Sequence, residues 1–337
     1  MPLVANTDLP SFGRLQSEGS PVIARDTAET REVRELHIGL LNMMPDKALE
    51  ATERQFFRLV GESNQIARFY MHPFTLEELQ RGKQGREHVE KYYRSFEQIQ
   101  SDRLDALIIT GANVVDPALD RQEFWSPLID VVNWAYDNVT SILCSCLATH
   151  ALLQFRYGQK RIPLARKCWG IYSHRVRERS HPLVAGMNTR FDVPHSRFNA
   201  VTPQQFAEAG LKVLVESDEV GVHLAASDDG LRLVFFQGHP EYDANSLFKE
   251  YKREVLRFMG GETGIYPPFP ENYFSLQTRA ILAEYRERVL EARTRGGELP
   301  PFPEQLISPS LDNTWHDSAE SVINNWVGEV YRSTHPG

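Results

Sequence analysis

The first half of the chain alternates between short apolar segments and longer amphipathic ones, and this alternation restricts the folds available to it. The apolar segments have the composition of buried strands and comprise "ELHIGLLN", "QIARFYMH", "DALIITG" and "VTSILCS", at residues 35–42, 65–72, 105–111 and 139–145. Segments with helical spacing of apolar residues lie among and after them, at residues 45–61, 124–138 and 147–157. Strands that alternate with helices are joined by crossover connections, which make consecutive strands parallel. The sequence therefore predicts an α/β fold with a mostly parallel sheet.

The second half continues with strand-like segments and ends in helices. The strand-like segments are "FDVPHSRFNAV", "LKVLVESDE", "VGVHLAAS" and "LRLVFFQGHPEYD". The last two are separated by "DDG", so we expect them to form an antiparallel hairpin. Helices are expected at residues 244–259 and 278–295. We expect a surface arm over residues 1–35, an α/β catalytic domain over 36–264, and a C-terminal extension over 265–337 whose inserted helix packs on the same domain.

The composition argues against several classes of partner. The chain has 337 residues, of which 41% are hydrophobic and 24% charged, as is typical of a soluble globular protein. Its net charge of −8 provides no broad basic surface, so neither nucleic acid nor membrane is expected as a partner. No segment reaches the roughly 20 apolar residues of a membrane span, and "MPLVANTDLPSFGRLQSEG" lacks the pattern of a secretory signal. Three cysteines make no disulfide framework, so we expect a cytoplasmic protein.

Two of the cysteines lie where a strand pattern changes to a helix pattern, in "TSILCSCLATHALL". In a parallel sheet, ligands bind beyond the carboxyl ends of the strands, and a residue at a sharp strand-to-helix turn projects its side chain there. Cys146 occupies such a turn, whereas Cys144 lies two residues earlier, on the same face and deeper. The N–H groups that open the following helix are free to bind an anion. Cys146 is therefore a candidate nucleophile; the alternative is a small buried hydrophobic residue.

A nucleophilic thiol needs a base, because free cysteine is mostly protonated at pH 7. The segment "FFQGHPEYDA" contains His239 after a strand-ending glycine and Glu241 two residues later, where a carboxylate can orient and stabilise the imidazole. Cys146, His239 and Glu241 therefore form a candidate catalytic triad. The alternatives are a plain Gly-His-Pro-Glu turn and a metal site made of Cys144, Cys146 and His150. That set lacks a fourth ligand, so no metal is expected.

Several longer segments resemble the homoserine O-acyltransferase (homoserine O-succinyltransferase) family, a branch of the class I glutamine amidotransferase-like superfamily. The similarity runs from about residue 36 onward through "IGLLNMMPDK", "ERQFFRLVG", "LDALIITGAN", "VTSILCSCLATHALL", "KCWGIYSHRV", "VPHSRFNAV", "GHPEYDANSL" and "NTWHDSAESVINNWV". The conjunction of "PHSR" with "GHPEYDA" is highly specific. The resemblance implies a flavodoxin-like α/β fold, with helices on both faces of a mostly parallel sheet, of the class I glutamine amidotransferase-like type.

The resemblance implies an acyltransferase that moves a succinyl group from succinyl-CoA to the hydroxyl of L-homoserine, in methionine biosynthesis. Cys146 would accept the acyl group, His239 would act as general base, and Glu241 would support it. An oxyanion hole is needed at both steps. Its candidate donors are the backbone N–H groups of Leu147 and of Ala112 or Asn113. No cofactor is expected beyond acyl-CoA as co-substrate, and the family suggests a homodimer.

The resemblance also implies which residues hold the amino-acid substrate. The matching positions are Lys167 in "RKCWG", Ser196 in "PHSR" and Arg253 in "KEYKREV". The fork-shaped guanidinium of Arg253 suits the carboxylate of a zwitterion, and the hydroxyl of Ser196 can donate or accept. Lys47 matches a lysine near the site, although this chain has two extra residues after it compared with the family's "MPxKxETE" pattern.

The acyl donor and the acceptor stay open at the level of sequence. In the family, the position of Val115 helps to separate succinyl from acetyl donors: glycine leaves room for succinate, whereas glutamate repels it. Valine is uncharged but occupies space, so we favour succinyl-CoA and keep acetyl-CoA as the alternative. Leu147 stands where the family usually has tryptophan, so L-serine stays an alternative acceptor.

Two other functions are less favoured. A glutaminase of the same superfamily would carry G-x-C-x-G-x-Q around its nucleophile, and here both glycines and the glutamine are replaced. A non-enzymatic binding protein would have no reason to keep the complete set of site residues. Residues 276–305 resemble an insertion that either covers the site or extends a dimer interface.

Overall fold

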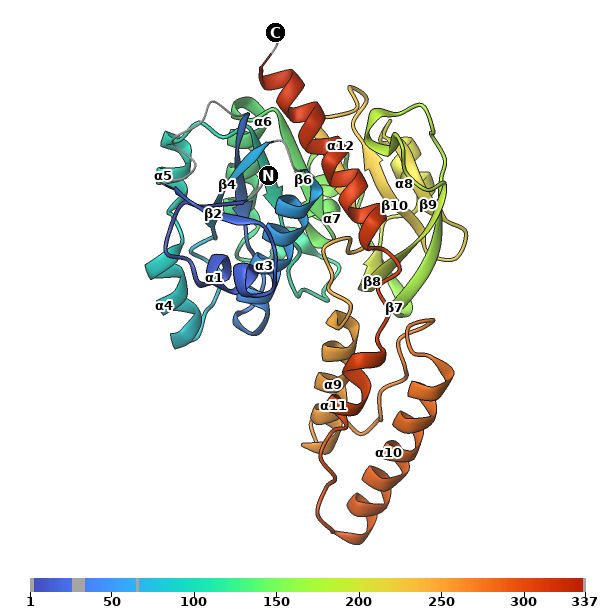
Figure 1. Ribbon diagram of the computed structural model, residues 1–337. Coiled ribbons are helices and arrows are strands. Elements are labelled where there is room, and N and C mark those ends of the chain that lie inside the picture. Colours follow the sequence, from blue (N-terminus) through green and yellow to red (C-terminus); the bar gives the residue numbers. More distant parts are fainter. Residues whose placement is uncertain (1–2, 26–33, 65–66, 336–337) are drawn as a thin grey trace.

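The computed structural model describes residues 3–25, 34–64 and 67–335, and within these ranges the strands form one 11-stranded sheet in the order β2-β1-β4-β3-β5-β6-β11-β10-β9-β7-β8. The centre of the sheet consists of parallel strands, which are β4 (Arg68–Phe74), β3 (Glu35–Leu41), β5 (Ala106–Ile109), β6 (Ser141–Ser145) and β11 (Leu233–Phe236). Numbered along the chain, these strands follow the order 2-1-3-4-5 of flavodoxin-like folds. The expected flavodoxin-like α/β fold with a mostly parallel sheet is confirmed (Figure 1).

The central strands are apolar without interruption because both of their faces are covered. Every residue of β5 and β6 is buried, and Ile108 of β5 is in register with Leu143 of β6. Parallel strands that are buried on both faces show such continuous apolar runs instead of an alternation of polar and apolar residues. The carboxyl ends of β5, β6 and β11 therefore meet at one edge of the sheet, with β6 between the other two.

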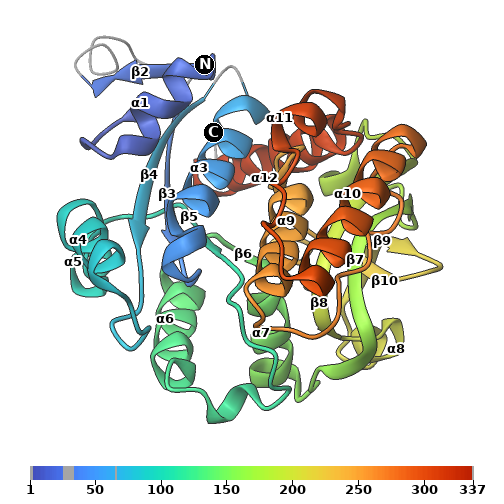
Figure 2. The same cartoon turned by 90° about the horizontal axis from the view of Figure 1, so that it is seen from below.

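Helices pack on both faces of this sheet, as expected (Figure 1, Figure 2). Apolar side chains on one face form a first core with α1 (Pro10–Ser17), α3 (Asp46–Ser63) and α12 (His316–Thr334). Those on the other face form a second core with α5 (Phe96–Ser101), α6 (Trp125–Asn138), α7 (Leu147–Tyr157) and α8 (Pro203–Glu208). Helix α4 (Lys83–Tyr92) contacts α3. Among the described residues, no helix has both the length and the apolar content needed to cross a membrane.

An antiparallel region extends the sheet beyond β11. Its strands are β10 (Gly221–Ala226), β9 (Lys212–Ser217), β7 (Ile162–Val176) and β8 (Arg190–Ala200). The expected hairpin is confirmed, because β10 and β11 pair antiparallel. The long strand β7 is an element that the sequence did not predict. Its first half is largely exposed, so the strand is defined by its pairing with β8 more than by its own sequence pattern. This pairing includes Ile162 and Pro163 and, after a shift in register, runs from Cys168 to Arg175.

The N-terminal segment is part of the fold, contrary to the surface arm expected over residues 1–35. Strands β1 (Leu3–Ala5) and β2 (Val22–Ala24) pair in parallel and add to the sheet beside β4. The side chains of Leu3, Phe12 and Leu15 are buried in the first core. Residues 1–2 and 26–33 of the expected arm, and residues 65–66 of the expected strand at 65–72, lie outside the described residues.

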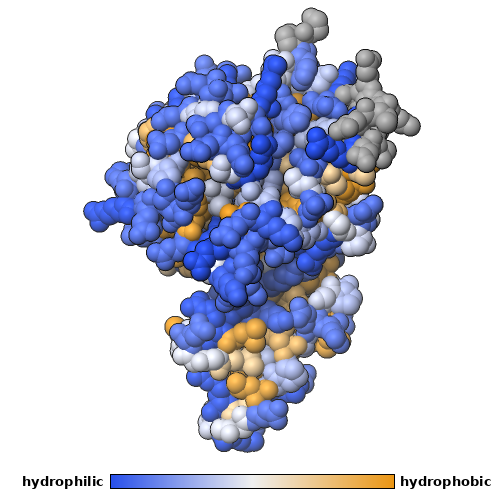
Figure 3. All heavy atoms as spheres, turned by 90° about the vertical axis from the view of Figure 1, so that its left-hand side faces the viewer, coloured by the Kyte–Doolittle hydropathy of each residue, from blue (hydrophilic) through white to orange (hydrophobic). Residues whose placement is uncertain are grey.

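A helical lobe projects from the sheet and has its own core (Figure 1). It contains α9 (Ser246–Met259), α10 (Leu276–Arg295) and α11 (Glu304–Ile307). The boundary expected at residue 264 does not separate this lobe from the sheet domain, because α9 packs in the lobe and α12 returns to the sheet. Figure 3 shows hydrophobic residues gathered on one face of the lobe. The large hydrophobic residues that the lobe exposes are Leu256, Ile265, Leu276 and Leu306.

Candidate active site

Cys146 forms a strained turn between a buried strand and a helix. It follows the last residue of β6 and precedes the first residue of α7, with φ 51° and ψ −104°. A residue other than glycine in such a conformation costs about 1–3 kcal/mol, which the surrounding structure must supply. The Cys146 N–H donates to the carbonyl of Phe236 at the end of β11 (2.7 Å), and the hydroxyl of Thr149 donates to the same carbonyl (2.8 Å). The turn is thus anchored, and the thiol projects beyond the carboxyl end of β6.

His239 and Glu241 follow β11, the neighbour of β6 in the sheet. The His239 N–H donates to the Pro194 carbonyl (2.9 Å), and its Nδ1 lies 2.8 Å from Glu241 Oε1. Gly238 permits this close packing, because a Cβ atom there would lie 2.5 Å from Val193 Cγ1. The structure therefore holds the imidazole from its backbone and from Nδ1, which leaves Nε2 for the reaction.

Electrostatics connect His239 to Cys146. Burial lowers the pKa of His239, but the negative charges of Glu241 and of the Cys146 thiolate outweigh this effect, and the pKa lies well above its ordinary value. Nε2 is buried and has no hydrogen bond of normal geometry within the described residues. The structure thus brings together Cys146, His239 and Glu241, and it favours a protonated imidazole beside the cysteine. This is the charge distribution of an activated cysteine nucleophile.

The loop after β5 lies against the first turn of α7. A Cβ atom on Gly111 would lie 3.4 Å from Cys146 Cβ and 3.8 Å from the Leu147 nitrogen. The N–H groups of Leu147, Ala112 and Asn113 have no acceptor among the described hydrogen bonds. The loop that begins at Gly111 and continues to Ala112 and Asn113 therefore lies close to the thiol and to the N-terminal end of α7, where a helix stabilises negative charge.

Glu250 of α9 is the centre of a second polar cluster. It accepts hydrogen bonds from Lys167 Nζ (2.9 Å), Ser196 Oγ (2.7 Å) and the Tyr242 hydroxyl (2.8 Å). Burial raises the pKa of Glu250, but Lys167 and the two hydroxyl donors lower it below its ordinary value, so this carboxylate is charged at neutral pH. The ring of Tyr242 stacks on His239, with centroids 4.3 Å apart. Lys167 and Ser196, two of the expected substrate residues, therefore meet close to the triad.

Glu250 and Tyr242 belong to this site but were not among the residues expected from the sequence. Tyr242 stands within the "GHPEYDA" motif, directly after Glu241, so its position in that motif was an available signal. Glu250 precedes Arg253 by three residues on α9, the spacing that puts two side chains on the same face of a helix.

The sequence is similar to that of known proteins over almost its whole length. A family model described as homoserine O-succinyltransferase matches residues 2–336. The chain belongs to the homoserine O-succinyltransferase family. Proteins named homoserine O-succinyltransferase from Nitrosococcus oceani and Allochromatium vinosum are each 65% identical to it over 335 residues, which cover 99% of this chain and 94% of the relative. One from Methylococcus capsulatus is 58% identical over 334 residues, with coverage of 99% and 94%. The expected family and the expectation of an enzyme are confirmed.

Solved structures that resemble the chain include glutamine amidotransferases. One from Thermotoga maritima has 10% sequence identity and a TM-score of 0.45, and the match covers 89% of this chain and 99% of that one. One from Methylobacillus flagellatus has 12% identity and a TM-score of 0.45, with coverage of 88% and 95%.

Three other residues were expected at the site from the resemblance to the homoserine O-succinyltransferase family. They lie outside both the triad and the Glu250 cluster. The Arg253 side chain is 53% exposed, and its Nε donates to Glu254 (3.1 Å). Lys47 is exposed in the first turn of α3. Val115 is 55% exposed, and its carbonyl accepts a hydrogen bond from Asn199 Nδ2 (3.0 Å). The structure does not bring these residues into contact with the triad.

Arg161, directly before β7, is a cation near the nucleophile that sequence reasoning missed. It is buried, and its Nη2 donates to the carbonyls of Val114 (2.8 Å) and Asp116. Burial lowers the pKa of Arg161, and the negative charges of Cys146 and Asp116 oppose that effect. Its Nε is buried without a hydrogen-bond partner among the described residues. In this member of the homoserine O-succinyltransferase family, Arg161 therefore holds the loop that carries Val115 and adds positive charge near the thiol.

The metal site considered from the sequence does not match the environment of its members. His150 Nε2 lies 3.0 Å from Gln237 Oε1, and burial lowers the pKa of His150 to about 3. Burial raises the pKa of the Cys144 thiol, which opposes the thiolate form that a metal needs. His150 and Cys144 are therefore buried packing residues next to the turn at Cys146.

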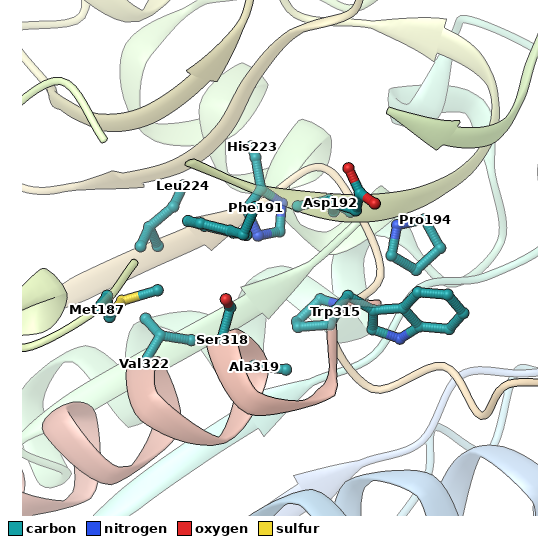
Figure 4. A pocket seen from close by; sticks show the side chains of 12 residues that line it. Met187, Phe191, Asp192, Pro194, His223, Leu224, Trp315, Ser318, Ala319 and Val322 are labelled. Atoms are coloured by element: carbon teal, nitrogen blue, oxygen red, sulfur yellow. The ribbon is translucent and has the colours of Figure 1, made fainter. Parts of the chain in front are cut away.

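The start of helix α12 packs against the segment that carries His239, Glu241 and Tyr242, called the catalytic loop below. Trp315 Nε1 donates to the carbonyl of Tyr242 (2.9 Å). Figure 4 shows Trp315, Ala319 and Val322 around a small cavity that His223 and Pro194 line from the sheet side. The volume of this cavity is about 10 Å³. The residues behind His239 are therefore closely packed, which keeps the loop in place.

Proposed function

We propose that the protein transfers a succinyl group from succinyl-CoA to the hydroxyl of L-homoserine through a thioester on Cys146, and that the product, O-succinylhomoserine, enters methionine biosynthesis. The observation that carries this proposal is the Cys146 elbow next to the His239–Glu241 pair. The names of the relatives supply the substrates, because each of the three described above is named homoserine O-succinyltransferase.

In the first step, the Cys146 thiolate attacks the thioester carbon of succinyl-CoA. The oxygen of the tetrahedral intermediate receives the N–H groups of Leu147 and of Ala112 or Asn113. The bond from carbon to the CoA sulfur then breaks, and the CoA thiolate takes the proton from His239. The enzyme is left with a succinyl thioester on Cys146 and a neutral imidazole.

In the second step, His239 accepts the proton of the homoserine hydroxyl as the oxygen attacks the thioester carbon. The same oxyanion donors stabilise the second intermediate. A carbon–oxygen bond forms, the carbon–sulfur bond breaks, and Cys146 leaves as a thiolate. The proton stays on His239, so the thiolate–imidazolium pair is restored, with Glu241 stabilising the imidazolium.

The Glu250 cluster suits a zwitterionic acceptor. The Glu250 carboxylate can receive the substrate's ammonium group, and Lys167, which now donates to Glu250 at 2.9 Å, can turn to the substrate's carboxylate. Ser196 bonds the same Glu250 oxygen as Lys167 and positions that carboxylate. Arg253 lies one turn further along α9 and contributes to the outer part of the site when its side chain leaves Glu254.

The choice of a succinyl donor rests on Arg161. A succinyl group ends in a carboxylate, whereas an acetyl group does not, and a guanidinium binds carboxylates in a paired geometry. Arg161 is buried near Cys146 and has a free Nε, whereas Val115 is exposed and uncharged. The site therefore favours succinyl-CoA over acetyl-CoA, and the reaction needs no cofactor besides its co-substrate.

We place the enzyme in the cytoplasm, in keeping with its low cysteine content. We also propose that it forms a homodimer. The apolar side chains that the helical lobe exposes, Leu256, Ile265, Leu276 and Leu306, offer a surface for a second copy. Residues 276–305, which contain α10, would then serve assembly more than cover the site. Light scattering of the purified protein tests this, since a monomer would exclude it.

The test of the proposed function is a matrix of two donors and two acceptors. Succinyl-CoA and acetyl-CoA are each combined with L-homoserine and L-serine, and the released CoA thiol is measured. We expect turnover to be fastest for succinyl-CoA with L-homoserine and to be lost in Cys146→Ala with the fold retained. Faster reaction with acetyl-CoA would exclude the succinyl donor, and release of ammonia from glutamine would point to a glutaminase.

A further inference from the structure

We propose that a cavity behind the catalytic loop binds the phosphate group of a small molecule, at a cluster of cations centred on Arg54. The cavity has a volume of about 430 Å³. It is lined by α1, α3, the segment 240–245, and the start of α12. Glu241 and Tyr242 contribute to its wall, so the cavity adjoins the active site. Phosphate binding at this place does not rest on the function proposed above; only the assignment of the phosphate to the acyl donor does.

Arg54 is a buried cation whose Nε has no hydrogen-bond acceptor in the part of the chain that the structure describes. Its side chain is only 6% exposed, and its Nε, which is fully buried, makes no hydrogen bond within the described residues. The carboxylate of Glu18 is 3.8 Å from this nitrogen, which is beyond hydrogen-bond distance. A buried guanidinium without an acceptor is costly, so the folded protein has a strong tendency to bind an anion at this place.

The cations around Arg54 outnumber the carboxylates near them. Four cations line this end of the cavity, namely Arg14, Arg54, Arg58 and Lys249, whereas the acids beside them are Glu18 and Asp243. Arg58 forms ion pairs with both acids, and Arg14 pairs with Glu18 at 3.2 Å. Both carboxylates are therefore already occupied by other arginines, and two positive charges stay uncompensated, since four cations face two anions.

Burial and the mutual repulsion of these cations lower the pKa values of Arg54 and Lys249. Burial lowers the pKa of Arg54, and Arg14 and Arg58 lower it further, against the effects of Asp243 and Glu18. Partial burial of the Lys249 ammonium also lowers its pKa, and Arg54 and Arg14 add to that shift, whereas Asp243 and Glu18 oppose it. A bound dianion would relieve both effects.

Three other acids line the cavity. Glu241 is paired with His239 Nδ1 at 2.8 Å, and Glu62 and Glu320 lie around His316 at the far end. Glu62 accepts a hydrogen bond from Ser20 (2.6 Å), and its other oxygen lies 3.6 Å from His316 Nε2. Glu320 lies 3.7 Å from the same nitrogen. These residues make the far end acidic, so an anion will bind at the Arg54 end.

The chemistry of the cationic end suits a phosphate group. A phosphate at neutral pH carries close to two negative charges and several acceptor oxygens, which match the two uncompensated cations and the free Arg54 Nε. The cavity is larger than a phosphate ion, so a phosphate that belongs to a larger molecule also fits. Two sources have this chemistry: a free phosphate-bearing metabolite, or a phosphate of the acyl-CoA co-substrate.

Isothermal titration calorimetry with inorganic phosphate, at constant ionic strength and without substrates, tests the site. We expect saturable binding, with affinity at least tenfold weaker in Arg54→Met and in Lys249→Gln. The second variant changes an exposed residue, so it should not impair folding. Lys83→Gln is the matched control, since this side chain is 85% exposed and lies outside the cavity. No saturable heat, or equal affinities in all four proteins, would overturn the proposal.

A second arm identifies the source of the phosphate. The KM for succinyl-CoA is compared between the unchanged protein and Lys249→Gln. A rise of tenfold or more, with the KM for homoserine unchanged, assigns the phosphate to the acyl donor. An unchanged KM together with weakened phosphate binding assigns it to a separate ligand. Because the first arm measures binding directly, its result stands whether or not the protein turns over succinyl-CoA.

Discussion

The imidazole of His239 stacks on the ring of Tyr242, with centroids 4.3 Å apart and planes inclined by 18°. The hydroxyl of Tyr242 donates to Glu250 at 2.8 Å. One side chain therefore contacts both the base of the triad and the carboxylate that holds Lys167 and Ser196. In the proposed reaction, this contact sets the position of the amino-acid substrate relative to the base that deprotonates it.

Tyr242→Phe keeps the stacking on His239 but removes the hydrogen bond to Glu250. A hydrogen bond to a charged group contributes about 1.5–3 kcal/mol, which corresponds to a loss of about 10- to 150-fold. We expect kcat/KM for homoserine to fall within that range. The burst of CoA released from succinyl-CoA without homoserine should keep its rate, because the first step does not use Glu250. An equal loss in both half-reactions would contradict a role in acceptor binding.

Glu241→Gln should change the pH profile as well as the rate. The charges of Glu241 and Cys146 raise the pKa of His239 above 6.5, so the imidazolium that pairs with the thiolate persists to higher pH in the unchanged protein. Without the Glu241 charge, His239 loses its proton at lower pH. The alkaline limb of kcat/KM for succinyl-CoA should therefore move to lower pH. A profile that instead gains activity on its acid side would mean that the neutral imidazole is the form needed for the first step.

The same substitution has a consequence for stability. A raised pKa in the folded state stabilises the protein below the unfolded pKa of 6.5, and this contribution disappears as the pH rises through the folded value. The free energy of unfolding lost in Glu241→Gln should therefore be largest at acid pH and shrink toward alkaline pH. Urea unfolding at several pH values measures it, and a constant difference would show that the charge of Glu241 has no such effect.

Arg161→Lys tests the choice of acyl donor. The substitution keeps a positive charge near Cys146 but loses the guanidinium fork and its hydrogen bonds to the 114–116 loop. We expect the ratio of kcat/KM for succinyl-CoA to that for acetyl-CoA to fall by about tenfold, the value of one charge-assisted contact of about 1.4 kcal/mol. Equal losses for the two donors would mean that Arg161 only supports the loop.

Trp326→Ala tests how strongly α12 is bound to the sheet. Trp326 is fully buried, and its Nε1 donates to Ser141 Oγ of β6 at 2.8 Å. Removing a buried tryptophan side chain costs about 3–5 kcal/mol. Ser141→Ala, which leaves the ring in place, should cost about 1–3 kcal/mol through the unpaired N–H group. Urea unfolding compares the two, and a smaller loss in Trp326→Ala than in Ser141→Ala would show that the ring is not part of the core.

The parts of this structure that local sequence determines were predictable. The elbow at Cys146 follows from an apolar strand next to a helix, and the hairpin of β10 and β11 follows from the turn residues between them. Strand β7 was not predictable in this way, because its pairing partner β8 defines it. The burial of Phe12 in the N-terminal segment likewise depends on α3, which lies far from it in the sequence.

In the site, too, residues set by local sequence were predictable, and residues set by distant partners were not. Residues in contiguous motifs, such as His239 and Glu241, could be located from the sequence, because two residues of spacing fix their distance. Glu250 could not, since its partners Lys167 and Ser196 come from different strands. The carboxylate was missed for this reason, and Arg253, the more conspicuous cation of the same helix, points instead to Glu254.

The central claim is that the acyl group rests on Cys146 between the two steps. The direct measurement is mass spectrometry of the peptide that carries Cys144 and Cys146, after mixing the enzyme with succinyl-CoA alone. The account predicts one succinyl group on this peptide in the unchanged protein and in Cys144→Ala, none in Cys146→Ala, and loss of the group when homoserine is added. A peptide that stays unmodified while the enzyme turns over, or a succinyl group that persists in Cys146→Ala, would contradict it.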